Sequence, residues 1–314
     1  MRRGVKGGIN MRRITIGNCI DAPVVAMGCM RLTGAQDNLD SVIGTALECG
    51  IDYFDHADIY GGGQCEEVFG KYLAAHSDLR DKITVQTKCG IRSGFFDFSK
   101  EHIVNSVNAS LKRLQTDYLD VLLLHRPDTL MEPEEVAEAF SQLEREGKVK
   151  HFGVSNQNPY QIELLKTAVT QPIIINQLQF SVPEAGLVTS GLNVNMKNPE
   201  SVMHDGSSLE YSRIKGITIQ AWSPFQQGFI EKPFIGDYDN YPELNKTLEE
   251  LAEKYGVQPI SVASAWILRH PANIQIISGS MNPGRIRAIC AGADITLTRE
   301  DWYAVYRAAG FRLP

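Results

Sequence analysis

The feature that most constrains the fold of this 314-residue chain is a rhythm in its apolar residues. Short apolar segments recur along the sequence, and a longer stretch with helical periodicity follows each of them. Residues 120–125 and 173–180 are almost continuously apolar, which is typical of strands covered on both faces. In residues 133–146 the apolar positions recur three and four residues apart, as on one face of a helix. The eight apolar segments are 24–28, 51–55, 83–88, 118–125, 149–156, 173–180, 216–223 and 274–279.

This spacing predicts a barrel. Each unit spans about 32 residues, the size of one βα repeat, and about 250 residues is typical of a whole (β/α)8 barrel. An open doubly wound sheet gives the same alternation, but it needs a G-x-G-x-x-G fingerprint after its first strand, which residues 28–32 do not supply. Residues 12–16 and 18–22 predict a short hairpin before the barrel. We therefore predict an α/β fold, a (β/α)8 TIM barrel with a short N-terminal β-hairpin. We expect residues 12–314 to form one domain and residues 1–11 to be a disordered extension.

The composition restricts the partners of the chain. With 43% hydrophobic and 22% charged residues, the chain can bury a sizeable core, so disorder is excluded as its main state. The net charge of −6 argues against binding to nucleic acid or an anionic membrane surface. No segment reaches the roughly 18 apolar residues of a membrane span. The six cysteines form no C-x-x-C pair and are expected to be reduced thiols, as in a cytoplasmic protein.

Polar side chains end nearly every predicted strand. In a (β/α)8 barrel the carboxyl ends of the strands form the mouth in which chemistry takes place, so we expect these side chains to converge there. They are Asp55, Lys88, His125, Ser155, Asn156, Gln177, Gln179, Trp222 and Ser223. Tyr60 follows Asp55 on the loop that enters the next helix.

Four of these residues suggest carbonyl reduction. An ammonium group from Lys88 beside Tyr60 favours the phenolate, so we expect the pKa of Tyr60 to lie below its usual value of about 10. Asp55 is expected to hold Lys88 charged, and His125 to hydrogen-bond a bound carbonyl oxygen. A phenol beside such a donor can protonate the alkoxide that forms when hydride reaches the carbonyl carbon. No metal site is expected, because no H-x-H pair ends an early strand.

Four stretches of the sequence resemble the aldo-keto reductases, particularly the bacterial monomeric type. They are 50–61 (GIDYFDHADIYG) with Glu66 and Gly70 behind it, Thr87-Lys88, 110–127 (SLKRLQTDYLDVLLLHRP) and 147–156 (GKVKHFGVSN). The resemblance extends from about residue 12 to residue 310. It implies a monomeric, NADPH-dependent enzyme that reduces aldehydes and ketones to alcohols by hydride transfer. It also implies a catalytic tetrad of Asp55, Tyr60, Lys88 and His125, with Tyr60 as the general acid.

The resemblance further implies that NADPH lies across the barrel mouth, with NADH also possible. Ser155, Asn156 and Gln177 would hold the nicotinamide carboxamide. Trp222 would stack on the nicotinamide ring, and Arg285, with Arg287 as a helper, would bind the 2′-phosphate. The implied cofactor-binding residues are Gly28, Met30, Ser155, Asn156, Gln177, Trp222, Ser223, Pro224, Phe225, Gly228, Ser278, Gly279, Ser280 and Arg285. The chain departs from the family pattern at Asn282, Ala288 and Ile289, where a basic residue and an acidic-Asn pair are usual, and this leaves the adenine contacts open.

Two other functions stay open at this point. Lys88 at a strand end can form a Schiff base as in an aldolase, although Asp55 would keep it protonated. Alternatively, the barrel binds NADPH without turnover and docks on a partner as a redox sensor.

Loops 92–100 and 182–211 are expected to flank the mouth, and the phenylalanines of the first loop suggest an apolar or aromatic carbonyl. The substrate class expected from the sequence is broad: small aldehydes, ketones or dicarbonyls.

Overall fold

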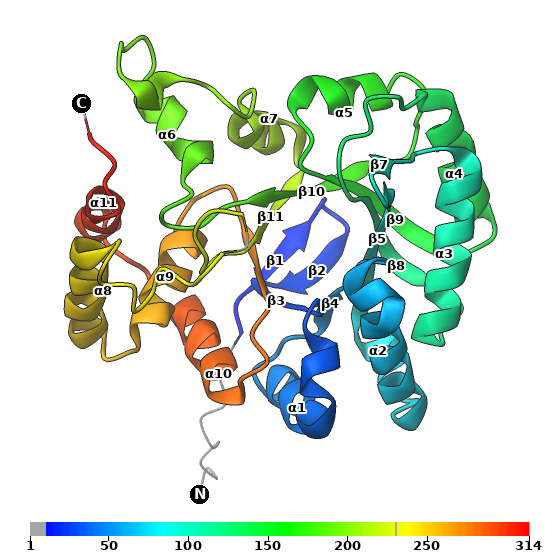
Figure 1. The fold of residues 1–314 in the computed structure, drawn as a ribbon, viewed down its shortest axis with the longest axis horizontal. Helices are drawn as coiled ribbons and strands as arrows, with labels where there is room; N and C mark the ends of the chain where they lie inside the picture. The colour runs from blue at the N-terminus through cyan, green and yellow to red at the C-terminus, as the bar shows by residue number, and fades with distance from the viewer. Residues whose placement is uncertain (1–10, 230, 314) are drawn as a thin grey trace, which may run out of the picture.

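A closed barrel of eight parallel strands forms the centre of the molecule, and helices surround it (Figure 1). The computed structural model describes residues 11–229 and 231–313. The strands are β3 (Val25–Gly28), β4 (Tyr53–Asp55), β5 (Thr84–Cys89), β8 (Leu119–Leu124), β9 (Val149–Ser155), β10 (Ile173–Gln179), β11 (Thr218–Trp222) and β12 (Gln275–Ser278). Each strand falls on one of the eight predicted segments, and β12 pairs with β3 to close the ring. The predicted (β/α)8 barrel is therefore confirmed.

Helices pack around the outside of the barrel. They are α1 (Leu39–Glu48), α2 (Gln64–Ala75), α3 (Lys100–Leu114), α4 (Pro133–Arg145), α5 (Pro159–Leu165), α6 (Gly186–Leu192), α7 (Ser208–Lys215), α8 (Pro242–Tyr255), α9 (Pro259–Leu268), α10 (Pro283–Ala291) and α11 (Arg299–Ala308). Short 3-10 turns cover Leu32–Asn38, Tyr60–Gly63, Arg80–Lys82, Pro199–Ser201 and Gly292–Asp294. Within 11–229 and 231–313, none of the helices combines the length and the apolar character needed to cross a lipid bilayer.

The helix α4 shows how the sequence pattern produces this packing. Pro133 stands at its first position, where the missing N–H has no intrahelical acceptor to lose. Val136, Ala139, Phe140 and Leu143 are then fully buried on the barrel side. The ring of Phe140 stacks on Phe152 of β9 with centroids 4.1 Å apart. The predicted apolar stripe is therefore the face that fixes α4 to the barrel.

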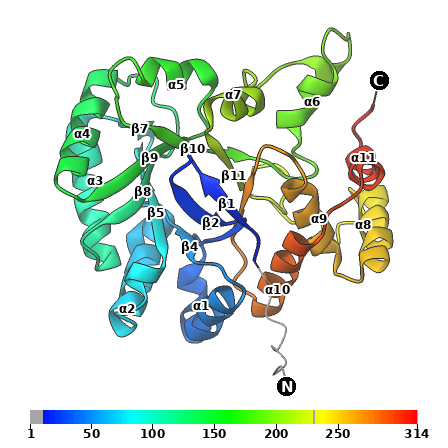
Figure 2. The same ribbon diagram turned by 180° about the vertical axis from the view of Figure 1, so that it is seen from behind.

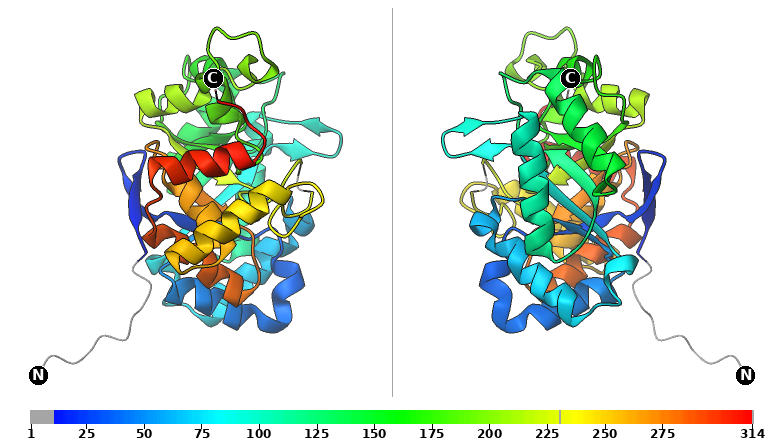
Figure 3. Two further views of the ribbon diagram at one scale, coloured as in Figure 1. Left: turned by 90° about the vertical axis from the view of Figure 1, so that its left-hand side faces the viewer. Right: turned by 90° about the vertical axis from the view of Figure 1, so that its right-hand side faces the viewer.

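Two hairpins mark the two ends of the barrel. The strands β1 (Arg13–Ile16) and β2 (Ile20–Pro23) form the predicted N-terminal hairpin, which lies in front of the barrel when the molecule is seen from behind (Figure 2). Ile16 and Ala22 pack there on Tyr53 in a small apolar cluster. The strands β6 (Ile91–Arg92) and β7 (Phe95–Phe96) form a second hairpin that projects from the opposite, carboxyl end (Figure 3). One end of the barrel is thus plugged, and the other is open to a ligand.

The expected disordered extension, residues 1–11, lies outside the described residues except for Met11. This residue is buried, with 8% of its surface exposed. It packs so closely on Gly50 that a Cβ atom there would lie 2.7 Å from the Met11 Cβ. The folded chain therefore includes Met11, one residue earlier than predicted, because an apolar side chain at this position fills a place beside the loop that enters β4.

Glu66 and Gly70, which belong to the stretches that resemble the aldo-keto reductases, support the fold and do not line the barrel mouth. Glu66 of α2 is fully buried and accepts hydrogen bonds from Thr87 Oγ1 at 2.6 Å and from Arg113 Nε at 2.8 Å. A Cβ atom on Gly70 would lie 2.1 Å from the carbonyl oxygen of Arg113. These residues fix α2 closely against α3 and so hold the loop that carries Tyr60.

Candidate active site

The carboxyl ends of the barrel strands surround a cleft of about 1200 Å³. Gln179 and Arg287, which were also predicted at the mouth, do not line it; of the predicted tetrad and the implied cofactor-binding residues, all but three do. Of the three, Lys88 is completely buried below the floor of the cleft. Gly228 and Ser278 are also absent from the lining, for reasons given below. The barrel topology therefore brings together residues as far apart in the chain as Gly28 on β3 and Arg285 on α10, which are 257 positions apart.

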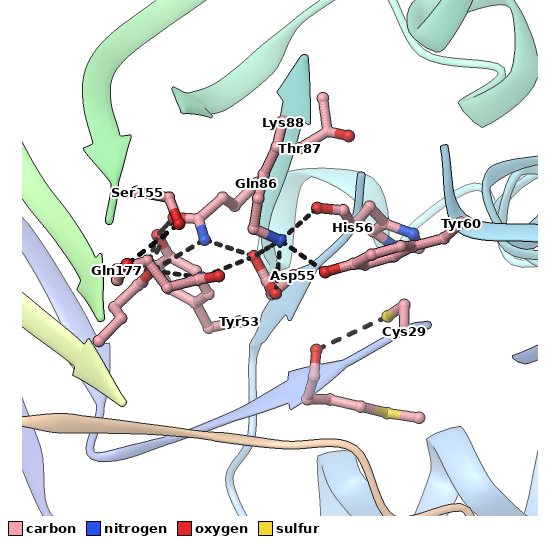
Figure 4. A network of polar contacts seen from close by, with 12 residues as sticks. Cys29, Tyr53, Asp55, His56, Tyr60, Gln86, Thr87, Lys88, Ser155 and Gln177 are labelled. Atoms are coloured by element: carbon pink, nitrogen blue, oxygen red, sulfur yellow. Dashed lines mark hydrogen bonds and ion pairs between the residues drawn. The ribbon is translucent and has the colours of Figure 1, made fainter. Parts of the chain in front are cut away.

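An ion pair between Asp55 and Lys88 forms the base of the site. The two side chains come from neighbouring strands, β4 and β5, and both are almost fully buried. Lys88 Nζ lies 2.8 Å from each Asp55 carboxylate oxygen, and it also donates to the backbone oxygen of His56 at 2.7 Å (Figure 4). Burial alone would lower the pKa of Lys88, but the charges of Asp55 and Tyr60 and their hydrogen bonds raise it. The ammonium group is therefore held in its charged form.

Tyr60 lies beside this ion pair, with its hydroxyl directed at Lys88 (Figure 4). Lys88 Nζ donates to the Tyr60 hydroxyl oxygen at 3.2 Å (Figure 4). The pKa of Tyr60 is raised, because burial favours the neutral phenol and outweighs the nearby charge of Lys88. The expectation that Lys88 brings the pKa of Tyr60 below its usual value is therefore wrong, since the sequence alone gives no measure of how deeply the phenol is buried. Lys88 limits the rise, and the phenol keeps its proton at neutral pH.

His125 completes the predicted tetrad. It follows β8, and its ring lies edge-on to the Tyr60 ring with centroids 6.0 Å apart. Burial, together with the charges of Lys88 and Arg126, places the pKa of His125 well below its usual range. The imidazole is therefore neutral at physiological pH, and its Nδ1 atom has no hydrogen-bond partner in the described part of the chain. A neutral ring can donate one N–H group to a ligand oxygen without bringing a further charge.

A buried network of amide side chains supports Asp55 from within the barrel. Gln86 Nε2 donates to Asp55 Oδ1 at 2.5 Å and to Gln220 Oε1 at 2.9 Å. Gln177 Nε2 donates to the same two acceptors at 3.2 and 3.0 Å, and the Tyr53 hydroxyl donates to Gln86 Oε1 at 2.6 Å. We did not predict Gln86 or Gln220 as site residues. The available signal was a glutamine two positions before Lys88 in an apolar strand, where both side chains point to the same face.

The side chains predicted to hold the nicotinamide form a hydrogen-bonded chain. Ser155 Oγ donates to the backbone oxygen of Gln177 at 3.0 Å and accepts from Asn156 Nδ2 at 2.7 Å. Asn156 Oδ1 in turn accepts from Trp222 Nε1 at 3.0 Å. Asn156 has a φ of 57°, a left-handed conformation that asparagine tolerates better than most residues. This series of hydrogen bonds fixes the indole ring of Trp222 at the edge of the cleft.

At the far end of the cleft, α10 begins with a hydrogen-bonded cap. Asn282 Oδ1 accepts from the backbone N–H of Arg285 at 2.9 Å. Arg285 is exposed and lines the cleft, whereas Arg287 pairs with Glu48 of α1 at 2.7 Å and does not line it. Arg31 was missed by the sequence analysis, because nothing in its neighbourhood distinguishes it. It also lines this end, with Nη1 donating to the backbone oxygen of Gly279 at 3.3 Å.

Gly228 and Ser278 occupy supporting positions. The N–H group of Gly228 donates to Glu184 Oε1 at 2.8 Å, and its carbonyl oxygen accepts from Gln179 Nε2 at 2.5 Å. Both backbone groups of Gly228 are therefore used inside the protein. Ser278 is 3% exposed at the end of β12, and its Oγ atom has no partner among the described residues. The backbone of Gly228 therefore joins its loop to Gln179 and Glu184, whereas Ser278 is simply buried at the strand end.

The two loops expected to flank the mouth contribute little to it. Residues 182–211, which include α6 and the start of α7, do not line the cleft. Phe98 is buried and packs against Gly90, whereas Phe95 and Phe96 are 55% and 43% exposed on the projecting hairpin. None of the three phenylalanines lines the cleft, so they give no support to an aromatic substrate. Within 11–229 and 231–313, no group of His, Cys, Asp and Glu is arranged to hold a metal ion.

Comparison with known proteins identifies relatives along nearly the whole chain. The sequence model of the Aldo/keto reductase family matches residues 24–309. The oxidoreductase YcsN of Bacillus subtilis is 36% identical over 97% of this chain and 100% of its own length. The 6-dehydroglucose reductase of Agrobacterium fabrum is 34% identical over 95% of this chain and 98% of its own length. A solved aldo/keto reductase from Klebsiella pneumoniae, in complex with NADP and acetate, is 21% identical with a TM-score of 0.75 and covers 97% of this chain and 96% of its own.

Proposed function

Because this chain belongs to the aldo/keto reductase family, we propose that it reduces aldehydes or ketones to alcohols with NADPH and that Tyr60 is the general acid. One observation carries the proposal. Lys88 touches both the Asp55 carboxylate and the Tyr60 hydroxyl, in a buried position at the floor of the cleft. The proposal is that the protonated Tyr60 phenol, which lines the cleft, meets a carbonyl oxygen and that the Lys88 cation stabilises the phenolate that remains.

The cleft has room and suitable groups for a dinucleotide. Its volume of about 1200 Å³ exceeds the roughly 300–1,000 Å³ of a pocket for a drug-sized ligand. Gln177 Oε1 has no partner among the described residues and is available to a carboxamide N–H, beside the Ser155 and Asn156 side chains. Trp222 offers a ring face and Arg285 a guanidinium at the far end. When bound, the cofactor supplies a hydride to the carbonyl carbon.

The protein moves the proton that balances the hydride. The Tyr60 hydroxyl donates its proton to the carbonyl oxygen, and the electron pair of the broken O–H bond stays on the phenolate. The ammonium group of Lys88, 3.2 Å from that oxygen, stabilises the phenolate, and Asp55 holds Lys88 in place. The neutral His125 ring donates an N–H to the same carbonyl oxygen and orients it. A positioned general acid typically accelerates such a step by about 10²–10⁴-fold.

The preference for NADPH over NADH is part of the proposal and depends on Arg285. A guanidinium can hold the 2′-phosphate of NADPH with paired donors, and NADH lacks that phosphate. For the substrate we propose small polar carbonyl compounds. One relative at 34% identity is named for the reduction of 6-dehydroglucose, and polar side chains such as His125, Asn156 and Gln177 line the reactive end of the cleft.

A Schiff-base aldolase is disfavoured by the same geometry. A nucleophilic lysine needs a lowered pKa, whereas Asp55 and Tyr60 raise that of Lys88. A barrel that only senses the cofactor is disfavoured by the relatives at 34–36% identity, which are named as an oxidoreductase and a reductase.

The experiment that tests the proposal has two parts. NADPH oxidation is followed with a panel of small aldehydes, ketones and dicarbonyls, and NADPH binding is measured by quenching of tryptophan fluorescence. We expect tight NADPH binding together with turnover of several carbonyls. Tight binding with no turnover on the whole panel contradicts a reductase and supports a sensor, whereas borohydride trapping of a carbonyl on Lys88 supports the aldolase.

A further inference from the structure

Arg126 differs from the other partly buried arginines that the structure describes. It follows His125 at the end of β8, is about half buried and lines the reactive end of the cleft. Arg80 and Arg113 each form an ion pair, with Asp120 at 2.9 Å and with Glu66 at 2.7 Å. Across 11–229 and 231–313, Arg126 has neither an ion pair nor a hydrogen bond. Its donors are therefore unused at the place where the proposed function puts the substrate.

Aromatic rings hold the Arg126 guanidinium in position. Its central carbon lies 5.4 Å from the ring centroid of Trp222 and 5.5 Å from that of Phe229. Trp222 and Phe229 meet edge to face with centroids 6.1 Å apart. Cation–π contacts of this kind attract the charge but satisfy none of the in-plane N–H groups. The guanidinium is thus positioned by the protein and still has its fork of donors free.

The charge of Arg126 also reaches the reacting groups. It is one of the causes that lower the pKa of His125, and burial lowers the pKa of Arg126 itself. Two carboxylates line the described cleft, Asp55 and Glu231. Lys88 neutralises Asp55. The Glu231 carboxyl group packs over Gly228 and makes no ion pair with Arg126. No group within the described cleft neutralises Arg126.

We propose that Arg126 binds a carboxylate group on the substrate, so that the preferred substrates are short aldehydes or ketones that carry a carboxylate. This inference rests on the proposed function and names the substrate class of the same site. A planar guanidinium matches a carboxylate with two parallel hydrogen bonds. With the carbonyl oxygen at Tyr60 and His125, the carboxylate would lie on the side of Trp222 and Phe229. A neutral carbonyl compound would leave the partly desolvated charge of Arg126 unpaired.

The test compares two substrates that differ in one charge. The first is 4-oxobutanoate and the second is its neutral methyl ester, and kcat/KM is measured for both with NADPH. For the intact protein we expect 4-oxobutanoate to be preferred by about ten- to hundredfold, the usual range for a charge-assisted pair. Arg126→Leu should remove most of that preference, chiefly through KM for the acid, so that kcat/KM falls much further for 4-oxobutanoate than for the ester. Arg126→Lys should retain part of that preference.

The matched control is Arg92→Leu. Arg92 lies at the base of the projecting hairpin, pairs with Asp97 at 3.0 Å and does not line the cleft, so the variant removes the same charge near the mouth without touching the proposed contact. Its preference for the acid should equal that of the intact protein. An Arg126→Leu variant that keeps the preference, or that loses activity equally on both substrates, overturns the carboxylate site. So does an equal loss of preference in Arg92→Leu.

A binding measurement separates this inference from the proposed function. Succinate, which cannot be reduced at an aldehyde carbon, is titrated into the NADP-loaded protein while tryptophan fluorescence is followed. We expect the succinate Kd of Arg126→Leu to be at least tenfold weaker than that of the intact protein. If neither oxobutanoate compound is turned over, the proposed function fails for this class, and the succinate result alone decides whether Arg126 binds carboxylates. Equal succinate affinity in both proteins contradicts the site.

Discussion

The two ends of the cleft are built differently. At the reactive end, Asp55 and Lys88 are 1% and 0% exposed and stand on paired strands of the barrel. At the far end, Asn282 and Arg285 are exposed and stand at the start of one outer helix. The reactive end is therefore prepared by the fold itself, since its groups already hold one another in place. The far end has a prepared helix cap but depends on single side chains for selectivity, so substitutions there should change affinity without changing the chemistry.

The largest effect is expected from Tyr60→Phe at the reactive end. The variant removes only the hydroxyl group that donates the proton and leaves Asp55 and Lys88 paired. We expect kcat to fall by about 10²–10⁴-fold, the usual contribution of a general acid. NADPH affinity, measured by fluorescence titration, should stay within about threefold. A variant that retains more than a tenth of the original turnover would exclude Tyr60 as the acid.

Lys88→Met tests whether the ion pair of Asp55 and Lys88 contributes to both the stability and the activity of the protein. The variant leaves the buried Asp55 charge without its partner, which typically costs about 3–5 kcal/mol in the free energy of unfolding. The double variant Asp55→Asn with Lys88→Met should recover much of that stability, measured by urea denaturation, but little activity. Recovery of activity in the double variant would show that the pair is only structural.

The pH dependence of the reduction rate in Lys88→Met provides a second test of the role of Lys88. Burial raises the pKa of Tyr60 and Lys88 opposes the rise, so reduction in the intact protein should be constant at neutral pH and decline only above about pH 10, where the phenol loses its proton. Without Lys88 that decline should move to still higher pH. His125 is neutral well below pH 6.5, so neither protein should lose activity between pH 8 and 6.5 through its protonation. If activity declines at the same high pH in both proteins, Lys88 does not affect the pKa of Tyr60.

Arg285→Ala addresses the far end. A charge-assisted contact with a phosphate is worth about 1.5–3 kcal/mol, which corresponds to roughly ten- to hundredfold in affinity. We expect NADPH binding to weaken by that factor and NADH binding to change by less than about twofold. Arg287→Ala is the control, because its guanidinium pairs with Glu48 and donates to Thr45 of α1, away from the cleft. Equal weakening of both cofactors by Arg285→Ala would assign this arginine to another part of the cofactor or to the fold.

The difference between the two ends also explains what the sequence could predict. The barrel and the positions of Asp55, Lys88 and His125 follow from apolar periodicity and from polar residues at strand ends, which are local signals. The direction of the Tyr60 pKa shift could not be predicted, because it depends on how deeply the folded chain buries the phenol. The contact between Gln86 and Gln220 joins residues 134 positions apart across the barrel interior, and no local pattern records it.

The smallest effect is predicted for two glutamines of the buried network at the reactive end. Comparing their variants separates residues that support the fold from residues that position the acid. Gln86→Leu removes the amide that donates to Asp55 Oδ1, whereas Gln275→Leu removes a buried amide of the same network that contacts Gln220 and the backbone of Pro23 but not Asp55. Both variants should lose about 1–3 kcal/mol of stability, because each leaves buried polar partners unsatisfied.

Only Gln86→Leu should also lower kcat, by about tenfold, with KM nearly unchanged, since a less constrained Asp55 aims Lys88 less well at the Tyr60 oxygen. The measurement is kcat and KM at a temperature well below the unfolding of either variant. If Gln275→Leu lowers kcat as much as Gln86→Leu does, the whole network acts through barrel packing. Gln86 then has no separate positioning role, and the prepared reactive end reduces to Asp55, Lys88 and Tyr60 themselves.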